Sequence, residues 1–228
     1  MKKIMFNDKY GLTQAVLEGR KTMTRRVITI PETWHGIDVY GFCHVKGQAS
    51  LELTDGDDFT IEDPRTGQCA QIMPTYRIGE EVAVAQNYEQ AGWKPDTLQQ
   101  AWVKKPTIFP DLDEYQPLCG WVDLPFKYHK GWTNKMFVLA DLMPHRIRIT
   151  NIKVERLQDI SDADILREGI QEYTDEKGTW YQVENSHIVH YDIRQTFSEL
   201  IDRVSGRGTW DSNPYVFAYE FELLNPET

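Results

Sequence analysis

Two long segments with alternating apolar and polar residues constrain the fold of this chain more than any other feature. Residues 145–157 read HRIRITNIKVERL, and their alternation changes phase near Asn151. Residues 214–224 read PYVFAYEFELL and carry aromatic rings at every second position from Tyr215 to Phe221, followed by Leu223. Because successive side chains of a strand point to opposite faces, 145–157 predicts one long strand or a strand pair. By the same rule, 214–224 predicts a long strand with an aromatic face.

The helices expected from the sequence are short. They cover 11–18, which stops at Gly19, the segment that Ser161 caps and Gly169 ends, and 191–204, whose apolar residues share one helical face. Shorter strands are expected at 27–30, which stops at Pro31, and at 79–86, with a hairpin around Lys46-Gly47. Because no regular alternation of strand and helix is present, the pattern predicts an α+β fold with a mostly antiparallel sheet or a small barrel.

The composition favours a soluble protein with a small ligand. A formal net charge of −10 argues against binding along a nucleic-acid backbone, but it permits a local basic pocket for one phosphate, nucleotide or carboxylate. No apolar run approaches the roughly 18 residues of a membrane span, and the N-terminus has no stretch of signal-peptide type. The 3 cysteines are widely spaced, which fits a reducing compartment. We expect a cytoplasmic protein without membrane contact.

The common templates of metal and nucleophile chemistry are not present in the sequence. His187 and His190 stand three residues apart without a supporting carboxylate pattern, and Cys43 beside His44 reads as a small apolar residue next to a polar one. No nucleophile elbow, phosphate-binding loop or dinucleotide fingerprint occurs. We therefore expect neither a metal site nor a cofactor.

A basic octet at residues 19–26, GRKTMTRR, stands out against this acidic background. One interpretation is a solvated basic turn, because runs of charge usually face water. The other is a binding or catalytic site, because two threonine hydroxyls lie between lysine and arginine residues, a combination suited to holding an anion or activating a nucleophile.

The octet resembles the G-x-K-x-x-(E/T)-x-R signature of ASCH domains, which are small β-barrels similar to the PUA fold. Three further blocks resemble the same family in the same order: GEEVAVAQ at 79–86, ITNIKVERLQDISDADILREGI at 149–170, and GRGTWDSNPYVFAYEF at 206–221. The last block is similar to the ending of long members from bacteriophages and prophages. The resemblance implies a single domain over 1–228, a PUA-like barrel with short flanking helices and two large insertions at about 31–76 and 87–133.

Some compact bacterial ASCH proteins are amidohydrolases that remove the acetyl group from N4-acetylcytidine. The resemblance implies three catalytic residues here, with Thr24 as nucleophile, Lys21 as the base that activates it, and Glu168 as the acid for the leaving amine. Structural roles for each remain open, such as phosphate anchoring by Lys21. Positions 21 and 24 of a regular strand would face opposite sides, so a shared site requires a turn or twist between them.

Further residues are expected to bind the substrate. Arg25 and Arg26 belong to the octet, and Gln86 stands where many phage relatives carry an Arg-Glu pair, which implies a different substrate choice if that pair binds ligand. In the segment 87–133, with 4 tryptophans and 5 prolines, Trp93 or Trp132 either stacks a base or packs in a hydrophobic cluster beneath a long loop.

Two other functions remain open beside hydrolysis of a small nucleoside or nucleotide. One is an ASCH module that binds RNA or a nucleotide without catalysis. The other is a ribonuclease that uses the basic octet, although the sequence shows no carboxylate cluster for a metal-dependent version.

Overall fold

The computed structural model describes residues 1–30, 33–34, 37–38, 41–45, 58–62, 69–94 and 130–224. The described residues belong to two compact units. Unit 1 combines Met1–Phe6 with Val82–Arg146, and unit 2 combines Asn7–Glu81 with Ile147–Leu224. Most of the expected insertions, 31–76 and 87–133, lie outside the described residues, so a single domain with two insertions stays a prediction.

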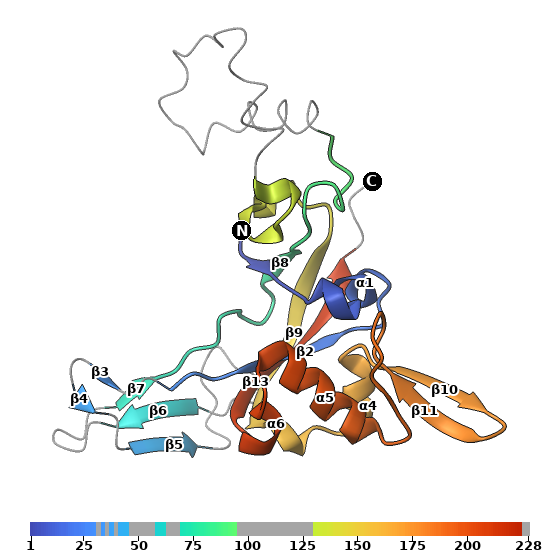
Figure 1. Ribbon diagram of the computed structural model, residues 1–228. Helices are drawn as coiled ribbons and strands as arrows, with labels where there is room; N and C mark the ends of the chain where they lie inside the picture. Colours follow the sequence, from blue (N-terminus) through green and yellow to red (C-terminus); the bar gives the residue numbers. More distant parts are fainter. Residues whose placement is uncertain are drawn as a thin grey trace, which may run out of the picture. The chain divides into compact units, whose positions relative to one another are not determined.

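Three neighbouring strands form the main sheet of unit 2, in the order β9, β13, β2 (Figure 1). They are β2 (Met23–Val27), β9 (Arg146–Arg156) and β13 (Tyr215–Leu224). The antiparallel register of β2 and β13 places Thr24 opposite Tyr219 and Arg26 opposite Phe217. The aromatic residues of β13 that the alternation predicted are largely buried, and Tyr219 is fully so. Both long predicted strands are confirmed.

The phase change in β9 is also confirmed. Ile147 and Ile149 are buried before Asn151, and Ile152 and Val154 are buried after it, so the inward-facing positions shift by one residue. The Asn151 side chain accepts a hydrogen bond from the Ile152 backbone N–H at 2.9 Å. This local bond stands at the point where the alternation changes phase, and the strand continues as one piece.

The strand predicted at 27–30 lies earlier in the chain than expected. The sequence favoured 27–30, but β2 covers Met23–Val27, and Val27 is already 42% exposed. The reason is the partner strand. β13 begins at Tyr215, so its ladder with β2 ends at the pair of Val216 and Val27, with one further bond from the Ile28 N–H to the Tyr215 carbonyl at 2.9 Å.

The predicted helices of unit 2 are confirmed within one or two residues at most ends. The helical elements are η1 (Asp8–Tyr10), α1 (Leu12–Leu17), η6 (Leu157–Asp159), α4 (Asp162–Arg167), α5 (Ile193–Ser205) and α6 (Thr209–Ser212). The Ser161 hydroxyl accepts from the Asp164 N–H at 3.1 Å and caps α4 as expected. Gly169 follows α4 with a φ of +102°, a backbone conformation that favours glycine.

Smaller sheets complete unit 2. They are β3 (Thr33–Trp34) with β4 (Ile37–Asp38), then β5 (Gly41–Val45) with β6 (Asp58–Glu62) and β7 (Cys69–Gln71), and finally β10 (Gln171–Asp175) with β11 (Gly178–Gln182) and β12 (Val189–His190). The hairpin expected at Lys46-Gly47 is wrong in its partner, because Val45 pairs with Asp58 rather than with a residue just beyond the turn. The turn residues themselves lie outside the described residues.

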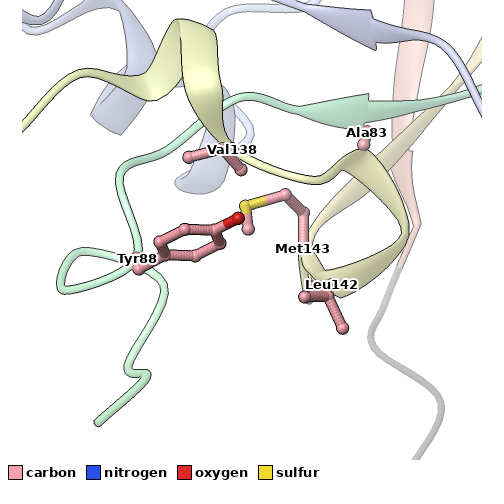
Figure 2. Packing of buried hydrophobic residues seen from close by; sticks show 5 residues of the cluster. All are labelled: Ala83, Tyr88, Val138, Leu142 and Met143. Atoms are coloured by element: carbon pink, nitrogen blue, oxygen red, sulfur yellow. The ribbon is translucent and has the colours of Figure 1, made fainter. Parts of the chain in front are cut away.

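Unit 1 contains a short parallel strand pair and three single-turn helices. They are β1 (Lys3–Ile4) with β8 (Glu81–Val84), and η3 (Lys130–Trp132), η4 (Lys135–Phe137) and η5 (Ala140–Leu142). Ala83, Tyr88, Val138, Leu142 and Met143 form a buried apolar cluster, in which the Tyr88 ring extends toward Val138 and Met143 (Figure 2). The strand predicted over 79–86 is thus confirmed for its middle residues.

The mixed α+β class is confirmed. The strand orders of the described residues are open and do not close into a barrel. No helix in the described part of the chain is both long and apolar enough to cross a membrane.

Candidate functional site

Backbone hydrogen bonds bring the basic octet against the end of α4. The Lys21 N–H donates to the carbonyl of Ala15 in α1 at 2.9 Å, and the Thr22 N–H donates to the carbonyl of Arg167 in α4 at 2.9 Å. Lys21 and Thr22 therefore lie between two helix ends before β2 begins. Glu168 is the residue that ends α4, and its N–H still donates to Asp164 and Ile165.

Lys21 and Glu168 form a buried ion pair. The Lys21 Nζ donates to Glu168 Oε2 at 2.6 Å and to the Glu168 backbone carbonyl at 2.7 Å. The two side chains are 2% and 6% exposed. Two residues 147 positions apart in the chain thus meet in a place shielded from water. We refer to this pair as the Lys21–Glu168 site.

Burial lowers the pKa of the Lys21 ammonium below its ordinary value of 10.5. The charge and hydrogen bond of Glu168 oppose this effect, while the charges of Arg26 and Arg25 add to the lowering. An amine shifted in this direction releases its proton more readily than a lysine in water, which is the property required of a general base.

Arg25 joins the site from β2. Its Nη1 donates to Glu168 Oε1 at 3.1 Å, and its Nε donates to Glu155 Oε1 at 2.8 Å. Its Nη2 lies 2.6 Å from the same Glu155 oxygen and 3.5 Å from Asp164 Oδ2, although neither contact has the geometry of a hydrogen bond. The Arg25 side chain is 1% exposed, so carboxylates surround its guanidinium in place of water.

Thr24 lies in β2, and it is 5% exposed. In sequence it stands close to Lys21, Arg25 and Arg26. Because side chains alternate along a strand, Thr24 and Arg26 share one face of β2, and Arg25 occupies the other. Lys21 precedes the strand, so the alternation within β2 does not decide on which side Lys21 lies relative to Thr24, and a site shared by the two residues stays a prediction. The described residues offer no hydrogen-bond partner to the Thr24 hydroxyl.

Arg26 is half-buried on the Thr24 face. Its charge lowers the pKa of Lys21 and also opposes the effect of burial, which raises the pKa of Tyr76. Tyr76 in turn packs edge-on against Tyr219, the cross-strand neighbour of Thr24, with ring centroids 5.3 Å apart. Arg26 therefore acts electrostatically both on the lysine of the ion pair and on the aromatic face of the sheet.

The remaining predicted binding residues belong to unit 1. Trp93 donates its ring N–H to the Leu142 carbonyl at 2.8 Å, and Trp132 lies edge-on to Tyr88 with centroids 5.5 Å apart. Both tryptophans are partly buried against the apolar cluster, as the packing interpretation expected. Gln86 is 4% exposed, donates weakly to the Gln90 carbonyl at 3.4 Å, and leaves its buried Oε1 without a partner among the described residues.

Glu155 and Asp164 are the participants that the sequence did not reveal. Glu155 stands at a polar position of β9, and Asp164 belongs to the acidic first turn of α4, where acids commonly favour the helix dipole. Both patterns have sufficient local explanations, so only the three-dimensional contact with Arg25 distinguishes these acids from others. No group of three or more histidine, cysteine, aspartate or glutamate residues in the described ranges is placed to hold a metal ion.

Comparisons with protein-family models, with curated proteins and with solved structures each find no match. The chemistry of the Lys21–Glu168 site is therefore inferred from its own residues.

Proposed function

We propose that the protein is a hydrolase of modified nucleosides that cleaves an N-acyl amide of the kind found in N4-acetylcytidine. The observation that carries the proposal is the buried contact of 2.6 Å between Lys21 Nζ and Glu168 Oε2, in which burial lowers the pKa of the lysine. A lysine and a glutamate removed from water and in direct contact can exchange a proton, which amide hydrolysis requires.

In the first half of the reaction, Lys21 in its neutral form takes the proton of the Thr24 hydroxyl. The Thr24 oxygen then attacks the acyl carbonyl carbon, and a tetrahedral intermediate forms. Arg26, on the same face of β2 as Thr24, supplies positive charge for the developing oxyanion. The support for this step is that Lys21 and Thr24 are three residues apart in the octet and are both buried.

In the second half, the bond between the acyl carbon and the cytosine N4 breaks. The proton taken by Lys21 passes through Glu168 to the leaving amine, and the acyl group remains as an ester on Thr24. A water molecule, deprotonated by the same pair, then attacks the ester and releases the carboxylic acid and the threonine hydroxyl. The sum is one amide and one water converted to one acid and one amine.

The fold assigned to this function is an ASCH domain with a PUA-like barrel, proposed for the chain from its four ordered sequence blocks. The basic octet leads into β2, and the block at 149–170 contains β9 and α4, which supplies Glu168. Fold alone does not define an activity, so the substrate class is taken from the resemblance and the proton-transfer chemistry is argued from the ion pair.

The test is a panel of N4-acylated cytidines and other acylated nucleosides, incubated with the protein and followed by chromatography. Lys21→Met and Thr24→Val should each lower kcat/KM by about 1,000-fold or more, because each removes a group that acts on the reacting bond. Lys153→Met and Thr174→Val are matched controls at exposed positions of β9 and β10 and should leave the rate unchanged. Binding of nucleosides or RNA without turnover would overturn the hydrolase and favour the binding module.

The pH dependence of the reaction gives a second test. Because the neutral amine is the active form of Lys21, kcat/KM should rise about tenfold per pH unit until the amine is deprotonated. Burial lowers the pKa of Lys21, so the rise should level off below pH 10.5. A rate that is independent of pH from 6 to 10 would remove Lys21 from the role of base.

A further inference from the structure

Arg25 has a setting unlike that of a substrate-binding arginine. Substrate-binding guanidinium groups need donors that face the ligand, but the Arg25 side chain is 1% exposed and its nitrogens face the protein's own carboxylates. Two parts of the chain supply these carboxylates: β9 supplies Glu155, and α4 with the residue that caps its end supplies Asp164 and Glu168.

The Glu168 carboxylate is held through both of its oxygens. Oε1 accepts from Arg25 Nη1 at 3.1 Å, and Oε2 accepts from Lys21 Nζ at 2.6 Å. A planar guanidinium donates in fixed directions, so its position determines how the carboxylate is turned. The orientation of Arg25 therefore decides which Glu168 oxygen is presented to Lys21.

Glu155 fixes Arg25 in turn. Its Oε1 accepts from Arg25 Nε at 2.8 Å, and the Glu155 side chain is 18% exposed, so it is the most accessible member of the chain of contacts. Asp164 is less specific to Arg25, because it also accepts from Arg167 Nη1 at 3.3 Å. The anchoring contact of Arg25 is thus the one with Glu155.

We propose that Arg25 is a positioning residue, anchored on β9 by Glu155, that aims the Glu168 carboxylate at Lys21. This inference rests on the proposed function of the Lys21–Glu168 site and replaces the expectation that Arg25 binds substrate. Glu155 is 13 residues before Glu168 in the chain, yet it acts on Glu168 only through an arginine on another strand.

The test uses Glu155→Gln, because the Glu155 side chain is partly exposed and its substitution disturbs the buried interior less than a change of Arg25. Glu222→Gln is the matched control, since Glu222 lies on β13, is 54% exposed and pairs with Arg148. With the hydrolysable nucleoside, Glu155→Gln should lower kcat by about 10- to 100-fold and change KM less than twofold, as expected for a misplaced group. Arg25→Lys keeps the charge but not the planar fork, so it should lower kcat as well.

A measurement without turnover separates this inference from the proposed function. The side-chain signal of Lys21 in protein labelled with ¹³C-lysine is followed by NMR as the pH is raised, and Lys21→Met identifies the signal. In Glu155→Gln the titration midpoint of Lys21 should fall, because a negative charge is lost and the released Arg25 competes for Glu168. Glu222→Gln should leave the midpoint in place.

The outcomes are distinct. If the wild type hydrolyses no acylated nucleoside but the midpoint of Lys21 falls in Glu155→Gln, the proposed function fails and the positioning contact stands. If the wild type is active and Glu155→Gln changes neither kcat nor the midpoint, the positioning role is wrong. A raised KM with unchanged kcat in Glu155→Gln or Arg25→Lys would return Arg25 to substrate binding and overturn the inference.

Discussion

The two units of the molecule bury very different side chains. In unit 2, Lys21, Arg25 and Glu168 are charged or titratable groups that are withdrawn from water and pair with one another. In unit 1, the cluster around Tyr88 and Met143 is apolar, and its one buried hydroxyl accepts a hydrogen bond from the Leu139 N–H at 3.0 Å. The same degree of burial therefore contributes differently to the stability of the two units.

An apolar cluster stabilises a fold in proportion to the area it removes from water, at about 25 cal/mol per Å². A buried ion pair gains little or nothing over an apolar replacement, because the cost of desolvating both charges offsets their attraction. Stabilisation of the fold is a sufficient reason for the apolar packing of unit 1. The charges of unit 2 require another reason, and catalysis by a lysine with a lowered pKa is a sufficient one.

The largest effect is expected from Glu168→Gln, which removes the negative charge of the ion pair and keeps the shape of the side chain. We expect the free energy of unfolding to fall by about 3–5 kcal/mol near neutral pH, because Lys21 loses its buried counter-charge. Urea unfolding measures the change. Glu172→Gln, at an exposed position of β10, is the control and should change the free energy of unfolding by less than about 0.5 kcal/mol.

The same variant has a predicted pH dependence. A lysine whose folded pKa is lowered binds fewer protons in the folded state than in the unfolded state, so stability rises with pH between the folded pKa and 10.5. Loss of Glu168 lowers the pKa of Lys21 further and widens this window. The deficit of Glu168→Gln should therefore be largest at pH 6 to 7 and shrink as pH approaches 10. A deficit that is constant with pH would mean that Lys21 does not titrate in this range.

A smaller effect is expected from Tyr88→Phe in unit 1. The change leaves the ring in the apolar cluster but removes the acceptor of the Leu139 N–H, which should cost about 1–2 kcal/mol of unfolding free energy. No titrating group is involved, so urea unfolding should give the same loss from pH 6 to 9. Tyr173→Phe, on a ring that is 39% exposed, serves as the control. A loss that varied with pH would erase the contrast between the two units.

The parts of the fold that follow from nearby residues could be predicted from the sequence. The alternation of 145–157 gave β9 with its phase change, and Ser161 with Gly169 gave the ends of α4. The extent of β2 could not be predicted, because the start of β13, almost 190 residues later, sets where their pairing stops. The hairpin β10–β11 and the strand β12 were not expected at all, although Glu176 and Lys177 form a tight connection between paired strands.

The candidate site divides in the same way. The octet stood out by its positive charge, whereas Glu168 was assigned only through the family resemblance, and the chemistry of both was argued from residue types. The contact of Arg25 with Glu155 joins positions 130 apart through one guanidinium, and no local pattern encodes such a contact. Arginine and glutamate at polar positions of two strands are common, so their pairing emerges only from the order of strands in the sheet.

The smallest expected effect concerns Gln86, where unit 1 departs from its own apolar character. Its Oε1 is buried and has no partner among the described residues, and its amide donates only a weak bond of 3.4 Å to Gln90. Replacing an unsatisfied buried group by an apolar one of similar shape is nearly neutral or stabilising. Gln86→Met should therefore leave the unfolding free energy unchanged or raise it by up to about 1 kcal/mol, while Gln195→Met on the exposed side of α5 should have no effect. A loss of 1 kcal/mol or more in urea unfolding would show that Oε1 is satisfied in solution. If the same variant also raised KM for an acylated nucleoside, Gln86 would belong to substrate recognition, and its unsatisfied oxygen would be explained by a donor on the ligand.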